Sequence, residues 1–179
     1  NTNMHSFIVK DSVTFLALRH SIKTIINMKI TLTFLIILFS FGLVNAQNSQ
    51  RKKHFNVSKS TIAIDGYDPV AYFTSKKAIE GKKEYSLNVD GIGYYFSSAS
   101  NRDLFKANPS KYEPQFGGWC AYAMGENGEK VSIDPETFKI LNGKLYLFYN
   151  KYFNNTLKDW NKNEVLLKQK AEQNWSKFN

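Results

Sequence analysis

The sequence predicts one small α+β domain, in which two β-hairpins pack against short helices and a C-terminal helical segment. Two observations predict the hairpins: Asp90-Gly91 and Asn142-Gly143 are favoured pairs for tight turns, and apolar and polar residues alternate over residues 85–89, just before the first pair. A third observation predicts the C-terminal helices, because apolar side chains recur there at helical spacing, with a break near residues 161–163. A hydrophobic content of 42% suits a single globular domain.

The first half of the domain reads as a helix, a hairpin and a second helix. Asp68 followed by Pro69 is typical of a helix start, so a short helix is expected over residues 69–74. Strand periodicity over residues 85–89 and an aromatic return strand over 93–97 flank the first turn pair.

The helix after this hairpin has signals at both ends. Either Ser98 or Ser100 can cap its start, and Ser100 with Asp103 matches a capping box. Asn108-Pro109 is expected to end it, because the residue before proline avoids the helical region.

The second half repeats this order. Gly117-Gly118 is expected to open a helical turn over residues 119–124, and Asp134-Pro135 is a turn signal. Strands are expected over residues 138–141 and 144–148. The apolar faces of the two C-terminal helices are expected to be Tyr152, Phe153, Thr156, Leu157 and Trp160, then Leu167, Ala171 and Trp175.

The residues before the domain carry a targeting pattern. Met28-Lys29 is a short positive start, residues 30–44 are uncharged and mostly apolar, and the sequence up to Ala46 fits a signal-peptide cleavage site. A membrane-spanning helix needs about 20 apolar residues, so this run is short for a permanent anchor, and an uncleaved anchor is the alternative. We therefore expect an extracytoplasmic protein, periplasmic or secreted. The expected division is a non-native extension at 1–27, a signal peptide at 28–46, a flexible leader at 47–60 and the domain at 61–179.

The charge pattern argues against a nucleic-acid partner. From Gln47 onwards the chain has 20 basic and 14 acidic residues, a net charge of +6. The positive residues are mostly scattered lysines, with arginine only at positions 51 and 102. A nucleic-acid interface usually gathers Arg and Lys on one face, so we expect a solvated basic surface instead.

Cys120 is the sharpest candidate for chemistry. As the only cysteine it cannot form an internal disulfide. At the start of a helix its pKa would be lowered, which favours a reactive thiol. Met124 lies four residues further on, so the two sulfurs could share a helical face and bind Cu(I). The alternative is that Cys120 is a small buried core residue, as free cysteines commonly are.

Aromatic residues around Cys120 are the candidates for a ligand pocket, with a plain aromatic core as the alternative. The ligand-binding candidates are Cys120, Met124, Trp119, Tyr122 and Tyr112. Three aspartates, Asp65, Asp68 and Asp134, lie at turns or before proline, where they favour local capping over an acidic cluster. No Ser-His-Asp set or phosphate-binding glycine loop is present, so a binding role is favoured over an enzymatic one.

Several short motifs, taken together, resemble the YHS domain family, and specifically its stand-alone exported members. The resemblance covers about residues 61–176. It rests on Gly66-Tyr67-Asp68-Pro69-Val70-Ala71-Tyr72-Phe73, Tyr95-Phe96-Ser97-Ser98, Asn101, Phe105, Asn108-Pro109, Lys111-Tyr112, Pro114-Gln115, Gly117-Gly118, Cys120-Ala121, Asp134-Pro135 and Asn142-Gly143-Lys144-Leu145-Tyr146-Leu147.

The resemblance implies an exported binding module of undetermined biochemical role, for a small ligand, a soft metal ion or a protein partner. Family members attached to copper-transporting ATPases carry paired cysteines, but the corresponding residues here are 97–101, Ser-Ser-Ala-Ser-Asn. We therefore expect no tight zinc site, and copper only as a weak Cu(I) site at Cys120 and Met124. The alternative function is a thiol-dependent redox or sensor protein that acts through Cys120. No membrane partner is expected beyond an uncleaved signal anchor.

Overall fold

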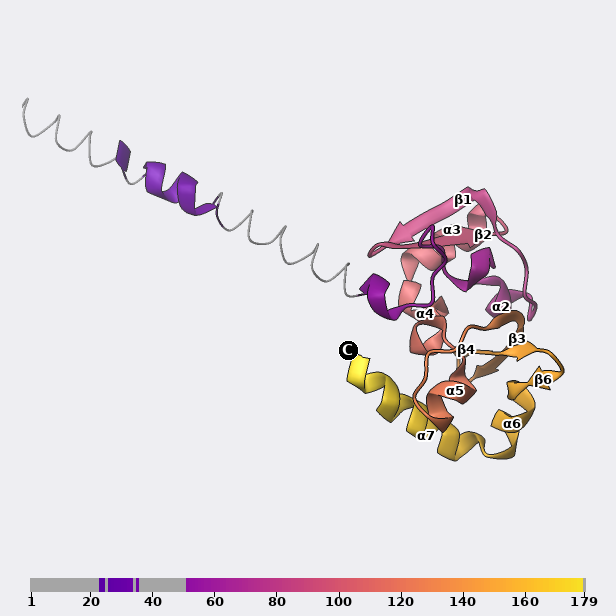
Figure 1. Cartoon of the computed structure of the whole chain (residues 1–179). Helices are drawn as coiled ribbons and strands as arrows, with labels where there is room; N and C mark the ends of the chain where they lie inside the picture. The colour runs from indigo at the N-terminus through magenta and orange to yellow at the C-terminus, as the bar shows by residue number, and fades with distance from the viewer. Residues whose placement is uncertain (1–22, 25, 34, 36–50, 179) are drawn as a thin grey trace, which may run out of the picture. The chain divides into compact units, whose positions relative to one another are not determined.

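The computed structural model describes residues 23–24, 26–33, 35 and 51–178, and divides the chain into two units at residues 47 and 48. In the first unit, the described residues 23–24, 26–33 and 35 are helical (Figure 1). Ala46 and most of the predicted apolar run lie outside the described residues. Among the residues described, no helix combines the length and the apolar character needed to cross a bilayer.

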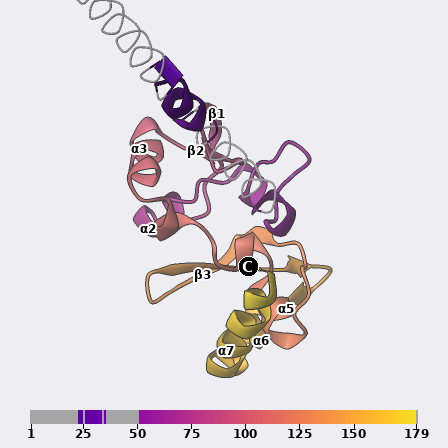
Figure 2. The same cartoon turned by 90° about the vertical axis from the view of Figure 1, so that its left-hand side faces the viewer.

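The second unit confirms the predicted α+β class. Short helices alternate with two-stranded antiparallel sheets, and the C-terminal helices lie together on one side of the second hairpin (Figures 1 and 2). The helices are η1 (Ile64–Gly66), α2 (Ala71–Thr74), α3 (Ala99–Ala107), α4 (Pro109–Tyr112), η2 (Gln115–Gly118), α5 (Ala121–Glu126), α6 (Thr156–Lys162), α7 (Glu164–Trp175) and η3 (Ser176–Phe178). The strands are β1 (Lys82–Val89), β2 (Ile92–Phe96), β3 (Asp134–Leu141), β4 (Lys144–Phe148), β5 (Asn150–Lys151) and β6 (Asn154–Asn155).

Both predicted hairpins form across the predicted turn pairs. Strands β1 and β2 meet at Asp90 and Gly91, whose φ angles are 49° and 83°. Strands β3 and β4 meet at Asn142 and Gly143, whose φ angles are 51° and 72°. Two consecutive positive φ angles are what a two-residue hairpin turn requires, and Asn, Asp and Gly tolerate them best.

The helix ends follow from local capping. Ser98 caps α3 by accepting a hydrogen bond from the Asn101 N–H at 3.2 Å, so the expected Ser100 capping box is not the one used. Asn108 ends α3 and caps α4, where its side chain accepts from the Lys111 N–H. The predicted break between the C-terminal helices falls at Asn163.

Strand β4 separates two hydrophobic cores, because it is buried on both faces. Leu145 and Leu147 point into the first core cluster, whereas Tyr146 and Phe148 point into the second, as the period of two in a strand requires. The first core cluster is Ala63, Ile64, Val70, Tyr72, Ile92, Tyr94, Phe96, Phe105, Tyr112, Cys120, Ile133, Leu145 and Leu147. The second core cluster is Phe116, Ala121, Met124, Tyr146, Phe148, Trp160, Leu167 and Ala171.

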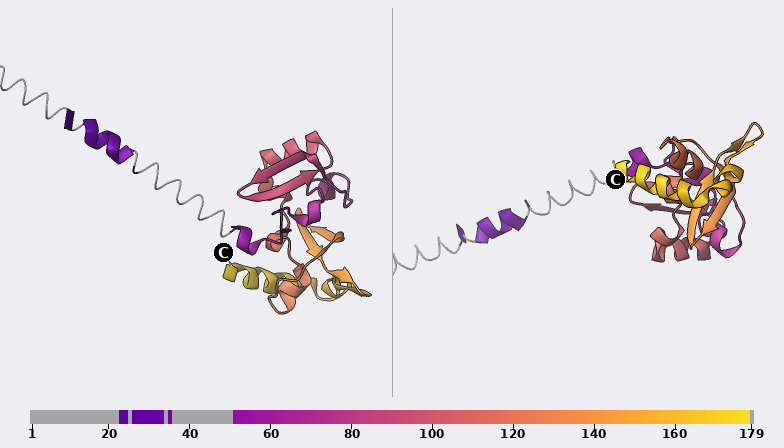
Figure 3. Two further views of the ribbon diagram at one scale, coloured as in Figure 1. Left: turned by 45° about the horizontal axis from the view of Figure 1, so that its top comes forward. Right: turned by 90° about the horizontal axis from the view of Figure 1, so that it is seen from below.

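The cores lie in different parts of the unit. The first hairpin covers one part, and the C-terminal helices cover the other (Figure 3). Helix α7 packs closely on α5 at Gly125, where an added Cβ would lie 2.4 Å from the Leu167 carbonyl oxygen. A larger side chain than glycine therefore cannot occupy this position without moving α7.

Three predicted elements differ from the structure. The helical turn expected from Trp119 begins only at Ala121, because Cys120 pairs with Leu147 in a parallel bridge and its N–H donates to the Val131 carbonyl oxygen at 3.0 Å. The turn expected at Asp134-Pro135 is the start of β3, which has an irregular register before Phe138.

The third difference lies after β4. Tyr152 and Phe153 were expected on a helix face, but they form the turn of a short third hairpin, β5–β6, and α6 starts only at Thr156. The spacing of the apolar residues fits a helix, and aromatic residues rarely occupy such turns. The local sequence therefore carries no signal for a turn here.

Candidate functional site

Cys120 is a fully buried residue whose sulfur ties three segments together. Its exposed fraction is 0%. The Sγ atom accepts a hydrogen bond from the Tyr149 N–H at 3.3 Å and lies 3.4 Å from Thr156 Oγ1. Thr156 Oγ1 also donates to the Tyr149 carbonyl oxygen at 2.9 Å. Cys120 therefore lies at the junction between α5, the end of β4 and the start of α6, out of reach of solvent.

The other predicted ligand-binding residues lie around Cys120 but do not face one cavity. Met124 is fully buried in the second core cluster, on the other side of β4 from Cys120. Tyr112 is buried in the first core cluster, with its ring centroid 5.4 Å from that of Phe73. Trp119 and Tyr122 are half-buried. The copper site at Cys120 and Met124 stays a prediction, and the described residues contain no group of three or more His, Cys, Asp or Glu side chains that could hold a metal ion.

Asp68 is a fully buried carboxylate that accepts five hydrogen bonds. Its Oδ1 accepts from the N–H groups of Val70 and Ala71 at 2.8 and 3.3 Å, which is the local capping expected from the sequence. Its Oδ2 accepts from the Ser97 N–H at 2.8 Å, the Ser97 hydroxyl at 2.6 Å and the Asn101 side-chain amide at 2.6 Å. One side chain thus joins α2, the end of β2 and the first turn of α3.

Residues 51–60 also belong to the folded unit. The Asn56 N–H donates to the Gly117 carbonyl oxygen at 2.8 Å, and the Asn56 side chain donates to the Gly118 carbonyl oxygen at 3.0 Å. The indole N–H of Trp119 donates to the His54 carbonyl oxygen at 2.7 Å. Residues 51–58 therefore contact the domain, although the composition of this stretch suggested a flexible leader.

These contacts create a groove of about 530 Å³ beside the Gly-Gly turn. Its lining residues come mainly from the start of the folded unit, from α4 and η2, and from the end of α7. The groove is lined by Arg51, Phe55, Ser110, Glu113, Pro114, Gln115, Phe116, Gly117, Lys144, Glu172, Trp175 and Ser176.

Glycine is required at the centre of this groove. Gly117 has a φ angle of 58°, and an added Cβ would lie 2.8 Å from the Trp175 ring and 3.2 Å from the Phe55 backbone. Phe116 also has a positive φ angle, 55°, and its ring faces that of Trp175 with centroids 6.4 Å apart. The absence of a side chain at Gly117 thus lets Phe55 and Trp175 approach the turn closely.

The polar end of the groove is an Arg51–Glu113 ion pair. The Tyr94 hydroxyl donates to the same carboxylate oxygen of Glu113 at 2.7 Å, and burial next to that carboxylate raises the pKa of Tyr94. The Arg51 guanidinium also lies 4.4 Å from the centre of the Phe55 ring. Its Nε is buried and finds no hydrogen-bond partner among the described residues, but the side chain as a whole is 23% exposed, so other guanidinium N–H groups can donate to an acceptor on a ligand.

Beyond this groove, Lys130 holds the two ends of the unit together. Its Nζ lies 3.0 Å from His54 Nδ1 and 4.2 Å from the centre of the Phe178 ring. Loss of solvent contact lowers the pKa of His54, and the positive charges of Lys130 and Lys53 lower it further. A neutral His54 can accept a hydrogen bond from the Lys130 ammonium, whereas a protonated His54 cannot.

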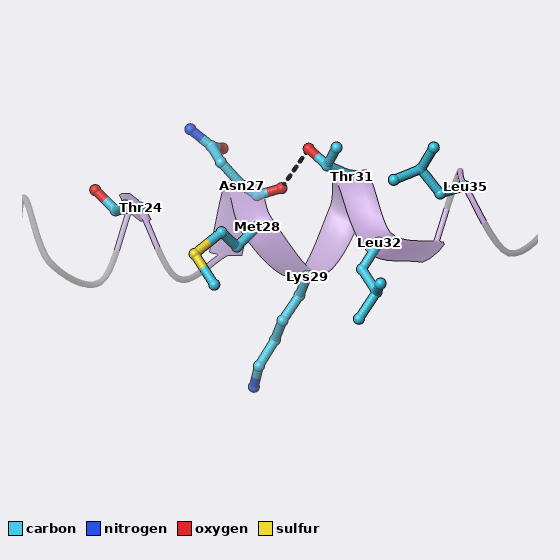
Figure 4. Close-up of a pocket in the computed structure, with 7 residues that line it drawn as sticks. All are labelled: Thr24, Asn27, Met28, Lys29, Thr31, Leu32 and Leu35. Atoms are coloured by element: carbon cyan, nitrogen blue, oxygen red, sulfur yellow. Dashed lines mark hydrogen bonds between the residues drawn. The ribbon is translucent and has the colours of Figure 1, made fainter.

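A second concavity, in the first unit, offers no comparable site. Its seven lining residues, Thr24, Asn27, Met28, Lys29, Thr31, Leu32 and Leu35, all come from one short stretch of the chain (Figure 4). Thr31 donates to the Asn27 carbonyl oxygen within the helix. In Figure 4 the side chains of Lys29 and Leu32 point away from those of Asn27 and Thr31, so these residues do not converge on a common point.

None of the predicted ligand-binding residues lines the groove. Residues 110–117 lie among the motifs of the family resemblance. In contrast, Arg51 and Phe55 were assigned to the leader, and Trp175 to a helix face. The Gly117-Gly118 pair was the only local signal for a close backbone approach. Searches of family models, curated proteins and solved structures found no match to this chain.

Proposed function

We propose that this protein is an exported, YHS-like binding module that takes a small organic ligand in the groove beside Gly117. The groove is the observation that carries this proposal, because aromatic side chains meet charged and polar ones in a single concavity. Its backbone geometry depends on the Gly-Gly pair, which is one of the motifs on which the family resemblance rests.

The Asp68 network supports the family assignment within this proposal. The motif that contains Asp68 and the motif that contains Ser97 are separated in sequence, as is Asn101, yet all three meet at one carboxylate. In this proposal the motifs build a scaffold. The groove, which lies elsewhere on the scaffold, provides the specificity.

The chemistry of the groove restricts the ligand class. The half-buried rings of Phe55 and Trp175 line the groove and offer aromatic surface to a planar or apolar group. Arg51 offers a guanidinium donor at the other end, while Glu113 balances its charge. We therefore expect a small molecule with an apolar or planar part and one hydrogen-bond acceptor, such as a carboxylate.

A fragment screen by NMR tests this proposal with reporters that the chain already contains. Trp175 lines the groove, whereas the indole N–H of Trp160 is bonded to Glu164 at 2.9 Å inside the second core region. Carboxylate-bearing aromatic fragments should shift the Trp175 indole and Gly117 amide signals and leave the Trp160 indole signal unchanged. Shifts confined to other parts of the unit would contradict the proposal.

The two arginines provide a matched pair of variants. Arg51→Met removes the groove guanidinium, and Arg102→Met removes the same charge from an exposed pair with Asp103 on α3. We expect fragment affinity to fall tenfold or more for Arg51→Met, because a charged hydrogen bond contributes about 1.5–3 kcal/mol. Arg102→Met should bind as wild type does. Equal affinities in both variants would show that the ligand does not use Arg51.

The second candidate function is thiol chemistry at Cys120. Its full burial and its two hydrogen-bonding neighbours support a structural role over a reactive one. Labelling with a maleimide reagent distinguishes the two roles: a structural thiol should react slowly in the native protein and rapidly in denaturant. Rapid native labelling, together with turnover lost in Cys120→Ser, would favour the redox alternative.

A further inference from the structure

The third hairpin turn has the same backbone conformation as the other two but the opposite chemistry. Tyr152 and Phe153 have φ angles of 53° and 65°, close to those of the Asp-Gly and Asn-Gly turns. Asn, Asp and Gly tolerate this region, whereas a bulky side chain there is strained. The chain therefore gives up stability to keep two aromatic residues at this turn.

These two rings contribute almost nothing to folding. The exposed fraction is 89% for Tyr152 and 112% for Phe153, the two highest values among the exposed large hydrophobic residues described. Neither ring belongs to either core cluster or takes part in a ring contact among the described residues. An apolar pair that is both strained and fully exposed is typical of a surface that contacts something else.

The base of this hairpin is firmly anchored. The Asn150 side-chain amide donates to Asp134 Oδ2 at 3.2 Å and to Thr137 Oγ1 at 2.9 Å. The other side is held by the Thr156 N–H, which donates to the Tyr149 carbonyl oxygen at 3.0 Å next to the buried Cys120 sulfur. The aromatic tip is thus presented from a fixed base, at the edge of the unit where Figure 1 labels β6.

The size of the tip decides what it can contact. A stable protein interface buries about 800 Å² on each partner, which is far more than two side chains on a narrow turn can provide. A lipid surface has no such requirement, because single Tyr and Phe side chains can enter the interfacial region. The neighbours of the tip in sequence, Asn150, Lys151, Asn154 and Asn155, are polar, so the apolar area ends abruptly.

The surrounding charge selects the kind of lipid surface. Lys151 is exposed next to the tip, and Lys158 is exposed on the helix that follows, where Lys162 is paired with Asp159 at 2.6 Å. Basic residues near an anionic membrane are attracted to its headgroups.

We propose that the Tyr152-Phe153 tip inserts into the interfacial region of an anionic lipid surface, while the neighbouring lysines contact the headgroups. This is a peripheral contact, and it needs no membrane-spanning helix. It is independent of the groove, so the two proposals can fail separately.

The test uses residues 48–179, which form a compact unit containing both core clusters. Binding is measured by co-sedimentation with vesicles of phosphatidylcholine alone and of phosphatidylcholine mixed with phosphatidylglycerol. The wild type should bind only the mixed vesicles, and binding should weaken at about 0.5 M NaCl, where screening shortens the reach of the lysine charges. Equal binding to both kinds of vesicle, or to neither, would overturn the proposal.

The decisive variant is Tyr152→Asn/Phe153→Gly, which copies the Asn-Gly turn found at residues 142 and 143. It should reduce binding to the mixed vesicles about tenfold or more, because it removes two interfacial aromatic residues. Its melting temperature should be equal to or higher than that of the wild type, so a loss of binding cannot reflect unfolding. Unchanged binding would overturn the proposal.

Two further measurements complete the test. Leu104→Ser removes another exposed apolar side chain, from α3, and should leave binding unchanged. An equal loss in this control would overturn the role of the tip. Light scattering without lipid should show the same mass for wild type and the turn variant. Self-association that depends on Tyr152 and Phe153 would identify a second copy as the partner and would also overturn the proposal.

Discussion

Strand β4 buries apolar side chains on both faces, but the interactions that stabilise the neighbouring segments differ between the two faces. On the first face, the core is joined to a buried carboxylate, Asp68, that accepts five hydrogen bonds from three segments. Aromatic rings pack on both faces, but no buried carboxylate is found on the second face among the described residues: there Trp160 lies 5.4 Å from Phe148 and 5.8 Å from Tyr146, measured between ring centroids. The stability of the first core should therefore be most sensitive to lost hydrogen bonds, and the stability of the second core to lost side-chain volume.

The largest expected effect is at Asp68. Asp68→Ala would leave five buried or half-buried donors without their acceptor, so we expect a loss of about 4 kcal/mol or more in the free energy of unfolding. The matched control is Asp65→Asn, at an exposed aspartate with a φ angle of 52°, which asparagine tolerates. The control should change stability by less than about 0.5 kcal/mol. Similar losses in both variants, measured by urea denaturation, would remove the contrast.

The second core should respond to lost volume. Trp160→Phe keeps an aromatic ring but leaves space beside Phe148 and removes the indole hydrogen bond to Glu164. We expect a loss of about 2 kcal/mol, which combines a small cavity with one hydrogen bond. The same urea titration measures it. No change in stability would mean that the second core can collapse around the smaller ring.

Two buried tyrosines differ in the hydrogen bonding of their hydroxyl groups. The Tyr94 hydroxyl donates to Glu113, so Tyr94→Phe should cost about 1–2 kcal/mol. The Tyr146 hydroxyl is buried and has no hydrogen-bond partner among the described residues, so Tyr146→Phe should be neutral or stabilising by up to about 1 kcal/mol. Thermal unfolding of both variants checks the difference in sign. A destabilised Tyr146→Phe would show that this hydroxyl has a role in the fold.

The smallest expected effect is a pH dependence at His54. Its pKa is lower in the folded than in the unfolded protein, so the unfolded state binds the proton first as the pH falls. The stability that His54 contributes should therefore be complete above about pH 6.5 and should decrease as the pH falls towards the folded pKa. Urea denaturation across this range measures the decrease, and His54→Gln should reduce it. An unchanged slope in that variant would assign the pH dependence to other groups.

The α+β class and the two main hairpins follow from local sequence signals. Asp90-Gly91 and Asn142-Gly143 specify their turns through local backbone preference, which acts over a few residues. The end of α3 at Asn108 and the break at Asn163 follow from equally local rules. Such features can be read directly because nothing distant competes with them.

Other features depend on contacts between residues far apart in sequence, and they become visible only in the tertiary structure. Asp68 reads as a turn residue, and its role as a junction appears only when Ser97 and Asn101 reach it. Cys120 lies before the start of α5 rather than inside it, because pairing with Leu147 overrides the local helical preference. The groove needs residues from both ends of the unit, and the Tyr152-Phe153 turn contradicts its own local preference. Packing between segments far apart in sequence decides these cases, and local patterns carry no signal for it.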